Sequence, residues 1–170
     1  MLRIISWPVV ALLLAQSAGQ APRPDFSGRW VLDQQHSTSI QDGKMVIRVV
    51  GMLGERFTAE QTSKTLTLKI TAFGREFTAV YNLDGSPSRL TSPTAPGQPD
   101  EEIVSYATWE GETLVVRTTT AEELNGKPVQ MTTRRKMWID PEGFLVLERT
   151  GTPVELVSPS RSVYRREGKE

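Results

Sequence analysis

His36 is the only histidine in this 170-residue sequence, which also contains no cysteine. A zinc site of the usual type would therefore lack ligands, and a Ser-His-Asp triad would need His36 as its base. His36 lies in the polar stretch Gln35-His36-Ser37, where a solvated histidine is ordinary. We therefore expect no catalytic residue, no metal site and no cofactor of these kinds.

Adjacent carboxylates occur at Glu101-Glu102 and at Glu122-Glu123. Glycoside hydrolysis needs two acids that converge across a cleft, one of them with a raised pKa, whereas adjacent acids in polar stretches are usually solvated. The sequence also lacks a glycine-rich phosphate loop between a strand and a helix. We expect a protein that is not an enzyme, and the open alternative is a hydrolase that uses other acids, such as Glu148 or Glu155.

Arg135 lies in a segment where apolar and polar residues alternate, so its charged side chain could be directed into the interior. On a strand it shares one face with Met131, Thr133, Met137 and Ile139. If that face points inward, the buried guanidinium needs a partner, either Glu148 or the head group of an anionic ligand, such as a carboxylate. The more ordinary alternative is a β-bulge that shifts the register and leaves Arg134 or Arg135 in water.

Aromatic residues supply further candidates for the lining of a binding site. Tyr81 shares a strand face with Phe77, Ala79 and Leu83, and Tyr106 is a second candidate. Trp109 and Trp138 flank turns, where an indole either caps the core or lines a mouth. The candidate ligand contacts are Arg135, Tyr81, Thr133, Tyr106, Trp109 and Met137.

Alternation of apolar and polar residues with period two dominates the chain and predicts half-buried antiparallel strands. Gly-containing turns such as Asp84-Gly85 and Asn125-Gly126 join them. About ten strands are expected, at residues 29–32, 45–50, 55–61, 65–72, 76–83, 103–109, 113–120, 129–139, 144–150 and 162–166. We predict an all-β, up-and-down meander that closes into a barrel and so removes its exposed edges, with a curved sandwich as the alternative.

Little else interrupts this pattern. Residues 86–100 carry four prolines and are expected to form a surface loop or a flap at the barrel mouth. Residues 34–40 and 121–124 are the best candidates for a turn or two of helix. An outer-membrane barrel is disfavoured because the second face of each strand carries Lys, Arg, Thr and Glu in place of a uniformly apolar lipid face.

The first residues predict the compartment. Met1-Leu2-Arg3 and the apolar run 4–15, followed by small residues, are typical of a secretory signal peptide, and the run is shorter than the roughly 20 residues of a spanning helix. We expect a signal peptide at residues 1–20, a single barrel domain at 21–170, and a periplasmic or secreted protein. Without Arg3 the balance is 19 basic against 20 acidic residues, which shows no basic surplus for nucleic acid.

Short motifs resemble two groups of known proteins. Gly28 and Trp30 in Phe26-Ser27-Gly28-Arg29-Trp30 resemble the Gly-x-Trp of lipocalin-like (calycin) barrels. That resemblance implies a tryptophan plug beneath the barrel, covered by an arginine for which the candidates are Arg149, Arg165 and Arg166. The same Phe-Ser-Gly-x-Trp start, with Trp109-Glu110-Gly111-Glu112-Thr113-Leu114 and Tyr164-Arg165, is similar to small exported bacterial proteins that are mostly without assigned function.

These observations lead to two hypotheses of different classes. In the first, the exported barrel binds a small, largely apolar or amphipathic molecule in its interior or mouth, without catalysis. In the second, a filled barrel acts as a rigid interaction or inhibitor module whose loop at residues 86–99 contacts a protein partner. The interior distinguishes them: tight packing of Phe57, Leu66, Leu68, Phe77, Leu114 and Met137 without a cavity would favour the second.

Overall fold

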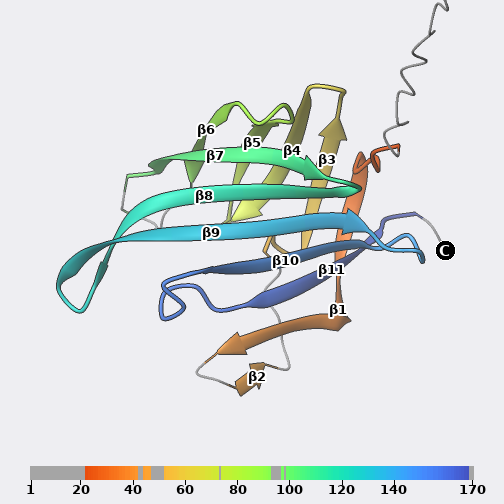
Figure 1. Cartoon of the computed structure of the whole chain (residues 1–170). Helices are drawn as coiled ribbons and strands as arrows, with labels where there is room; N and C mark the ends of the chain where they lie inside the picture. The colour runs from red at the N-terminus through yellow and green to blue at the C-terminus, as the bar shows by residue number, and fades with distance from the viewer. Residues whose placement is uncertain are drawn as a thin grey trace, which may run out of the picture.

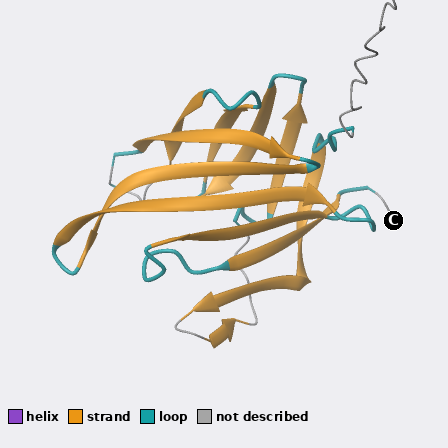
Figure 2. Cartoon of the chain, viewed as in Figure 1, coloured by secondary structure: helices purple, strands orange, loops and turns teal. Residues whose placement is uncertain are grey.

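The computed structural model of the protein describes residues 22–41, 44–46, 52–72, 74–92, 97 and 99–168. The described residues contain strands, turns and loops and no helix (Figure 2). Accordingly, no described helix is long and apolar enough to cross a membrane. The predicted signal peptide at residues 1–20 lies outside the described residues.

The strands form a single antiparallel sheet that curls into a nearly closed barrel (Figure 1). They are β1 Gly28–Gln41, β2 Lys44–Val46, β3 Arg56–Gln61, β4 Thr65–Ala72, β5 Arg75–Asn82, β6 Pro87–Ser92, β7 Glu101–Glu110, β8 Thr113–Leu124, β9 Lys127–Ile139, β10 Leu145–Thr152 and β11 Ser160–Arg166. Their order around the sheet is β5-β4-β3-β1-β11-β10-β9-β8-β7-β6, with β2 paired to β1. The predicted up-and-down β-barrel is confirmed.

The two edge strands, β5 and β6, come together where the barrel closes (Figure 1). A short turn joins them, and hydrogen bonds that involve side chains link them in place of a backbone ladder. The backbone N–H of Asn82 donates to Ser88 Oγ at 2.8 Å, and the Asn82 side-chain amide donates to the carbonyl of Pro87 at 3.0 Å. These two bonds link the edge strands next to the turn.

Three expectations about local structure are wrong. Residues 87–92, expected to lie in an irregular loop, form β6, which begins at Pro87, a position where proline costs no ladder bond. The alternation of buried Ser88 and Leu90 with exposed neighbours drives that strand. The candidate helical turns at 34–40 and 121–124 instead continue β1 and β8. Of the expected strand at 45–50, only residues 45 and 46 lie within the described residues, in β2.

Alternation places one face of every long strand in the interior. On β4, Leu66, Leu68 and Ile70 are buried and lie opposite Tyr81, Ala79 and Phe77 of β5. Burying an aliphatic or aromatic side chain contributes about 1.5–3 kcal/mol relative to exposing it. The centre of the barrel is therefore filled with apolar side chains, and these hold the strands in one register.

One end of the barrel is closed by Trp30, which is fully buried on β1. Its indole N–H donates to the carbonyl of Phe26 at 2.8 Å, and the Cζ atom of Arg166 lies 4.6 Å from its ring centroid. Arg166, one of the three candidate arginines, therefore covers the tryptophan as the calycin resemblance implies. Gly28 permits this approach, because a Cβ atom there would lie 2.8 Å from Arg166 Nη1.

Tyr164 on β11 joins the barrel wall to the segment before β3. Its hydroxyl accepts the backbone N–H of Leu53 at 3.0 Å and donates to the carbonyl of Gly54 at 3.1 Å. Burial raises the pKa of Tyr164 to about 12, since it disfavours the phenolate more than the Leu53 N–H favours it. The phenol therefore stays protonated well above the pH at which a free tyrosine ionises.

Gly28→Ala is expected to lower the free energy of unfolding by about 1–3 kcal/mol, because Gly28 has φ = 138° and the added methyl group would displace Arg166 from Trp30. Urea denaturation measures the change. Gly126→Ala serves as the control for backbone strain alone, since it also has a positive φ but nothing lies within 4 Å of its Cβ position. An equal loss in both variants would contradict a packing role for Gly28.

Tyr164→Phe is expected to flatten the loss of stability at alkaline pH. The raised pKa means that Tyr164 stabilises the fold fully below pH 10, and that this stability is lost as the pH rises from about 10 to about 12. The phenylalanine variant should be less stable at neutral pH by about 1–3 kcal/mol, because the Leu53 N–H loses its acceptor. As the pH rises from about 10 to about 12, its free energy of unfolding should fall less than that of the wild type. Tyr106→Phe is the control at an exposed tyrosine, and its free energy of unfolding should stay close to that of the wild type throughout the same denaturation series.

Candidate functional site

Arg135 lies on the inner face of the barrel. It pairs with Val116 of β8 and with Arg149 of β10, and both ladders run through this point without a register shift. The expectation of a β-bulge is therefore wrong. Arg134, the next residue on the outer face, donates to Glu110 Oε2 at 2.7 Å, so the two arginines lie on opposite faces of the sheet.

The guanidinium of Arg135 reaches across the interior to β5. Its Nη2 atom donates to the hydroxyl of Tyr81 at 3.2 Å, and its Cζ atom lies 5.9 Å from the centroid of that ring. The carboxylate considered as its partner, Glu148, instead lies 3.7 Å from Arg161 Nη1. Tyr81 thus orients Arg135 without neutralising it.

Arg149 lies directly opposite Arg135 on the neighbouring strand. Its Nη2 atom has one long hydrogen bond, 3.5 Å to the carbonyl of Ser158, and its Nε atom has no partner among the described residues. Burial, followed by repulsion from Arg135, lowers the pKa of Arg149 below its ordinary value. Like charges directly opposite each other on a sheet are destabilising, so this pair costs stability.

Both arginines line one cavity of about 260 Å³, which we call the mouth cavity. Its lining consists of Met52, Glu101, Ile103, Thr118, Thr120, Glu122, Met131, Thr133, Arg135 and Arg149. It lies at the end of the barrel away from Trp30, where the long β8-β9 hairpin extends beyond its neighbours (Figure 1).

The mouth cavity opens where the barrel wall divides. The last pair between β7 and β8 is Ser105 with Thr118, whose hydroxyl oxygens lie 2.7 Å apart. Beyond that pair, β7 continues beside β6, and β8 continues beside β9. The inner face of β8 therefore presents threonines and a carboxylate to a space that none of the described strands fills.

The mouth cavity can hold an anion. Within the described part of the chain, no carboxylate forms an ion pair with Arg135 or Arg149. Two guanidiniums side by side offer several N–H donors in the fork geometry that matches a carboxylate or phosphate. The hydroxyl of Thr133, another predicted contact, lies in the same lining.

The structure separates the remaining predicted contacts. Met137 is buried in the filled centre, and Tyr106 is 48% exposed on the outer face, so neither lines the mouth cavity. Trp109 lies at the opposite end of the barrel, stacked on Phe26 with a centroid distance of 5.7 Å. Of the predicted contacts, only Arg135 and Thr133 line the mouth cavity, and Tyr81 contacts Arg135.

Trp109 borders two cavities of about 650 and 340 Å³ at the closed end, together with Arg23, Ser63 and Leu83. Arg23 lies 5.3 Å from the centroid of its ring. The tryptophan is thus covered by Phe26 and Arg23, both from the segment that precedes β1, which fits a cap on the core better than a free binding surface.

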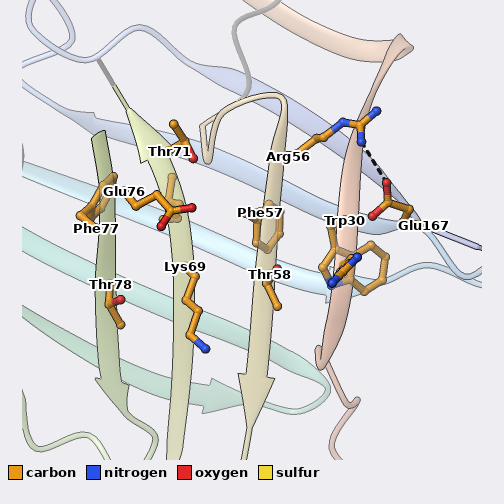
Figure 3. Close-up of a pocket in the computed structure, with 12 residues that line it drawn as sticks. Trp30, Arg56, Phe57, Thr58, Lys69, Thr71, Glu76, Phe77, Thr78 and Glu167 are labelled. Atoms are coloured by element: carbon orange, nitrogen blue, oxygen red, sulfur yellow. Dashed lines mark hydrogen bonds and ion pairs between the residues drawn. The ribbon is translucent and has the colours of Figure 1, made fainter. Parts of the chain in front are cut away.

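A cavity of about 480 Å³ lies over β1, β3, β4 and β5, and three of its five charged side chains, Arg56, Lys69 and Glu167, form ion pairs (Figure 3). Figure 3 shows Arg56 and Glu167 reaching toward each other, and their atoms lie 3.0 Å apart. Lys69, in a row with Thr58 and Thr78 across three strands, is ion-paired to Glu60 at 2.7 Å. Exposed, paired charges give this site less reason to bind an ion than the mouth cavity has.

Sequence analysis did not place Arg149, Thr118, Thr120 or Glu122 in a binding site. The pattern contained the necessary information, because Leu145 and Leu147 on β10 are buried and Arg149 follows them on the same face. Arg149 was considered only as a cover for Trp30, a position that Arg166 occupies. Within the described residues, no group of three or more acidic or histidine side chains is placed to hold a metal ion.

Comparison with known proteins supports the fold. No protein-family model matches the sequence, and no curated protein matches it. A solved mutant of the fluorescent protein UnaG is similar in structure, with a TM-score of 0.51, 18% sequence identity, and coverage of 85% of this chain and 97% of that chain. At this identity the likeness shows the fold alone, a calycin-like barrel. The narrower resemblance to exported Phe-Ser-Gly-x-Trp proteins stays a prediction.

Arg149→Met is expected to raise the free energy of unfolding of the ligand-free protein by about 0.5–2 kcal/mol, because it removes a desolvated charge that faces a like charge. Urea denaturation at neutral pH measures this. Arg117→Met is the matched control, since Arg117 is exposed and ion-paired to Glu110 at 3.2 Å, and it should change stability little or lower it. A destabilised Arg149→Met would show that the arginine is structural.

Proposed function

We propose that the protein is exported and binds a small amphipathic anion in the mouth cavity, where Arg135 and Arg149 hold the anionic group. One observation carries this proposal: two cross-strand arginines line one cavity, and among the described residues neither has a carboxylate partner. Tyr81 orients Arg135 from the opposite wall.

The energetics support a ligand. A desolvated guanidinium costs free energy unless it is paired, and the lowered pKa of Arg149 reflects that cost. An interior selected for stability alone would replace one of the two arginines by an apolar residue of similar size. An anionic group bound between them converts the repulsion into two charge-assisted interactions.

The size and lining of the mouth cavity favour a short molecule. Its volume of about 260 Å³ lies just below the roughly 300–1,000 Å³ typical of sites for drug-sized ligands. Met52, Ile103 and Met131 provide apolar contact, while the other lining residues are polar or charged. An amphipathic ligand with a short apolar part fits this lining better than the largely apolar ligand that the sequence predicts.

The fold and the start of the chain are compatible with this proposal. Barrels of about this size can enclose one small ligand, although fold alone does not fix function. Export rests on the basic start, the apolar run and the small residues of the first twenty positions. An exported binder would meet its ligand outside the cytoplasm.

The packed centre favours the second hypothesis, a filled barrel that acts as an interaction module. Phe57, Leu66, Leu68, Leu114 and Met137 are buried, whereas Phe77, the sixth residue of the predicted set, is half-buried and packs against the core. The proposed contact loop lies partly outside the described residues, at 93–96 and 98. The mouth cavity distinguishes the two hypotheses, since a pure interaction module has no use for two unneutralised guanidiniums.

Titration calorimetry with linear carboxylates from acetate to octanoate tests the proposal on the mature protein. We expect one saturable site that binds a mid-length carboxylate and rejects the matched neutral amide. Arg135→Gln and Arg149→Gln should each weaken binding about tenfold or more, since hydrogen bonds to a charged group contribute about 1.5–3 kcal/mol.

Arg134→Gln is the matched control, because Arg134 lies next to Arg135 on the outer face and is ion-paired to Glu110. It should bind like the wild type. Binding should also weaken with added salt, though less than for a fully exposed pair. Equal affinity for carboxylate and amide, or no effect of either inner arginine, would refute anion binding at this site.

A further inference from the structure

Two carboxylates share the mouth cavity with the two arginines. Glu101 lies at the start of β7 and is exposed, and Glu122 lies near the end of β8 and is half-buried. Among the described residues, neither forms an ion pair within 4.0 Å with Arg135 or Arg149. The cavity therefore contains opposite charges that do not neutralise each other directly.

The strand register explains this separation. Glu122 lies opposite Val129 on β9, six residues before Arg135, which corresponds to about 20 Å of extended strand. Arg135 is held at its end by Tyr81, and Arg149 by the carbonyl of Ser158. Glu122 accepts a hydrogen bond from Thr120 Oγ1 at 3.3 Å. Arg135, Arg149 and Glu122 thus each have a hydrogen bond near their own strand position.

We propose that the ligand is a zwitterion with well-separated charges, an ω-amino carboxylate or a short peptide, whose anion lies at Arg135 and Arg149 and whose ammonium group lies at Glu101 and Glu122. This inference rests on the proposed function and deepens it. It assigns to the two carboxylates a role that a purely anionic ligand would not need.

Charge balance favours this class over the alternatives. The four charged side chains of the mouth cavity sum to zero at neutral pH. A simple anion is attracted by the arginines but repelled by the carboxylates. A simple cation is attracted by the carboxylates but repelled by the arginines. A molecule with both charges forms a favourable electrostatic interaction at each of its ends, and its apolar middle contacts Met131 and Ile103.

Charge spacing favours zwitterions whose charges are well separated. In an α-amino acid the two charged groups are attached to one carbon, whereas Glu122 lies opposite Val129, about 20 Å of extended strand from Arg135. A chain of several methylene groups between the charges spans more of this separation. The site should therefore discriminate between isomers that differ only in the position of the amine.

Calorimetry on the mature protein with three probes tests this inference: hexanoate, ε-aminohexanoate and its isomer norleucine. Shorter and longer ω-amino carboxylates complete the series. For the wild type, the best ω-amino carboxylate should bind about fivefold more tightly than the carboxylate of equal length, which corresponds to two largely solvated ion pairs. Norleucine should show no such gain over hexanoate.

The Glu101→Gln/Glu122→Gln double variant should change the two affinities in opposite directions. Loss of the carboxylates weakens binding of the ω-amino carboxylate, whereas it strengthens binding of the simple carboxylate by removing repulsion. Glu123→Gln is the control, because Glu123 is exposed, lies next to Glu122 on the other face and does not line the cavity. It should leave both affinities unchanged.

The outcomes separate this inference from the proposed function. If carboxylates bind and the arginine variants weaken them, but no ω-amino carboxylate gains affinity, the zwitterion inference is wrong and the anion site stands. An equal gain for norleucine, or a double variant that weakens both probes alike, also overturns it. If no probe in the series binds the wild type, both proposals fail.

Discussion

The inside-outside alternation of one continuous ladder, from β8 through β9 to β10, determines the character of the site. No register shift interrupts these three strands, so every second residue is directed inward over their full length. Leu114, Met137 and Leu147 occupy the interior near one end, and the same alternation then directs Thr133, Arg135 and Arg149 inward near the other. The inward charges are therefore a consequence of the same pairing that builds the core.

The two ends of the barrel consequently differ in chemistry. At the closed end, Trp30 is covered by Arg166, and its one polar atom, the indole N–H, donates to the carbonyl of Phe26. At the open end, the ladder between β7 and β8 stops at Ser105, and the interior turns from apolar to polar within a few residues. The tightly packed half can tolerate strain at the other half, because the large apolar core sets the register independently of the mouth cavity.

Sequence analysis could predict the barrel because period two is a local property of each strand, as in the alternation of Leu66, Leu68 and Ile70. It could not predict β6, since prolines conceal the short alternation of Ser88 and Leu90. It also could not settle the orientation of Arg135, because a single β-bulge would have turned its side chain to the other face. A β-bulge cannot be recognised reliably from one sequence. The pairing of Arg135 with Arg149 depends on register between strands, which composition does not specify.

The proposed function couples binding and stability at this site: a bound counter-charge stabilises the folded protein. Arg135 and Arg149 lower stability when the cavity holds no counter-charge, and any molecule that binds only the folded state restores it in proportion to its occupancy. With the proposed ligand, the protein would then be most stable when that ligand is abundant. The same repulsion that costs stability also raises selectivity, because a neutral analogue leaves both guanidiniums unpaired while occupying the same space.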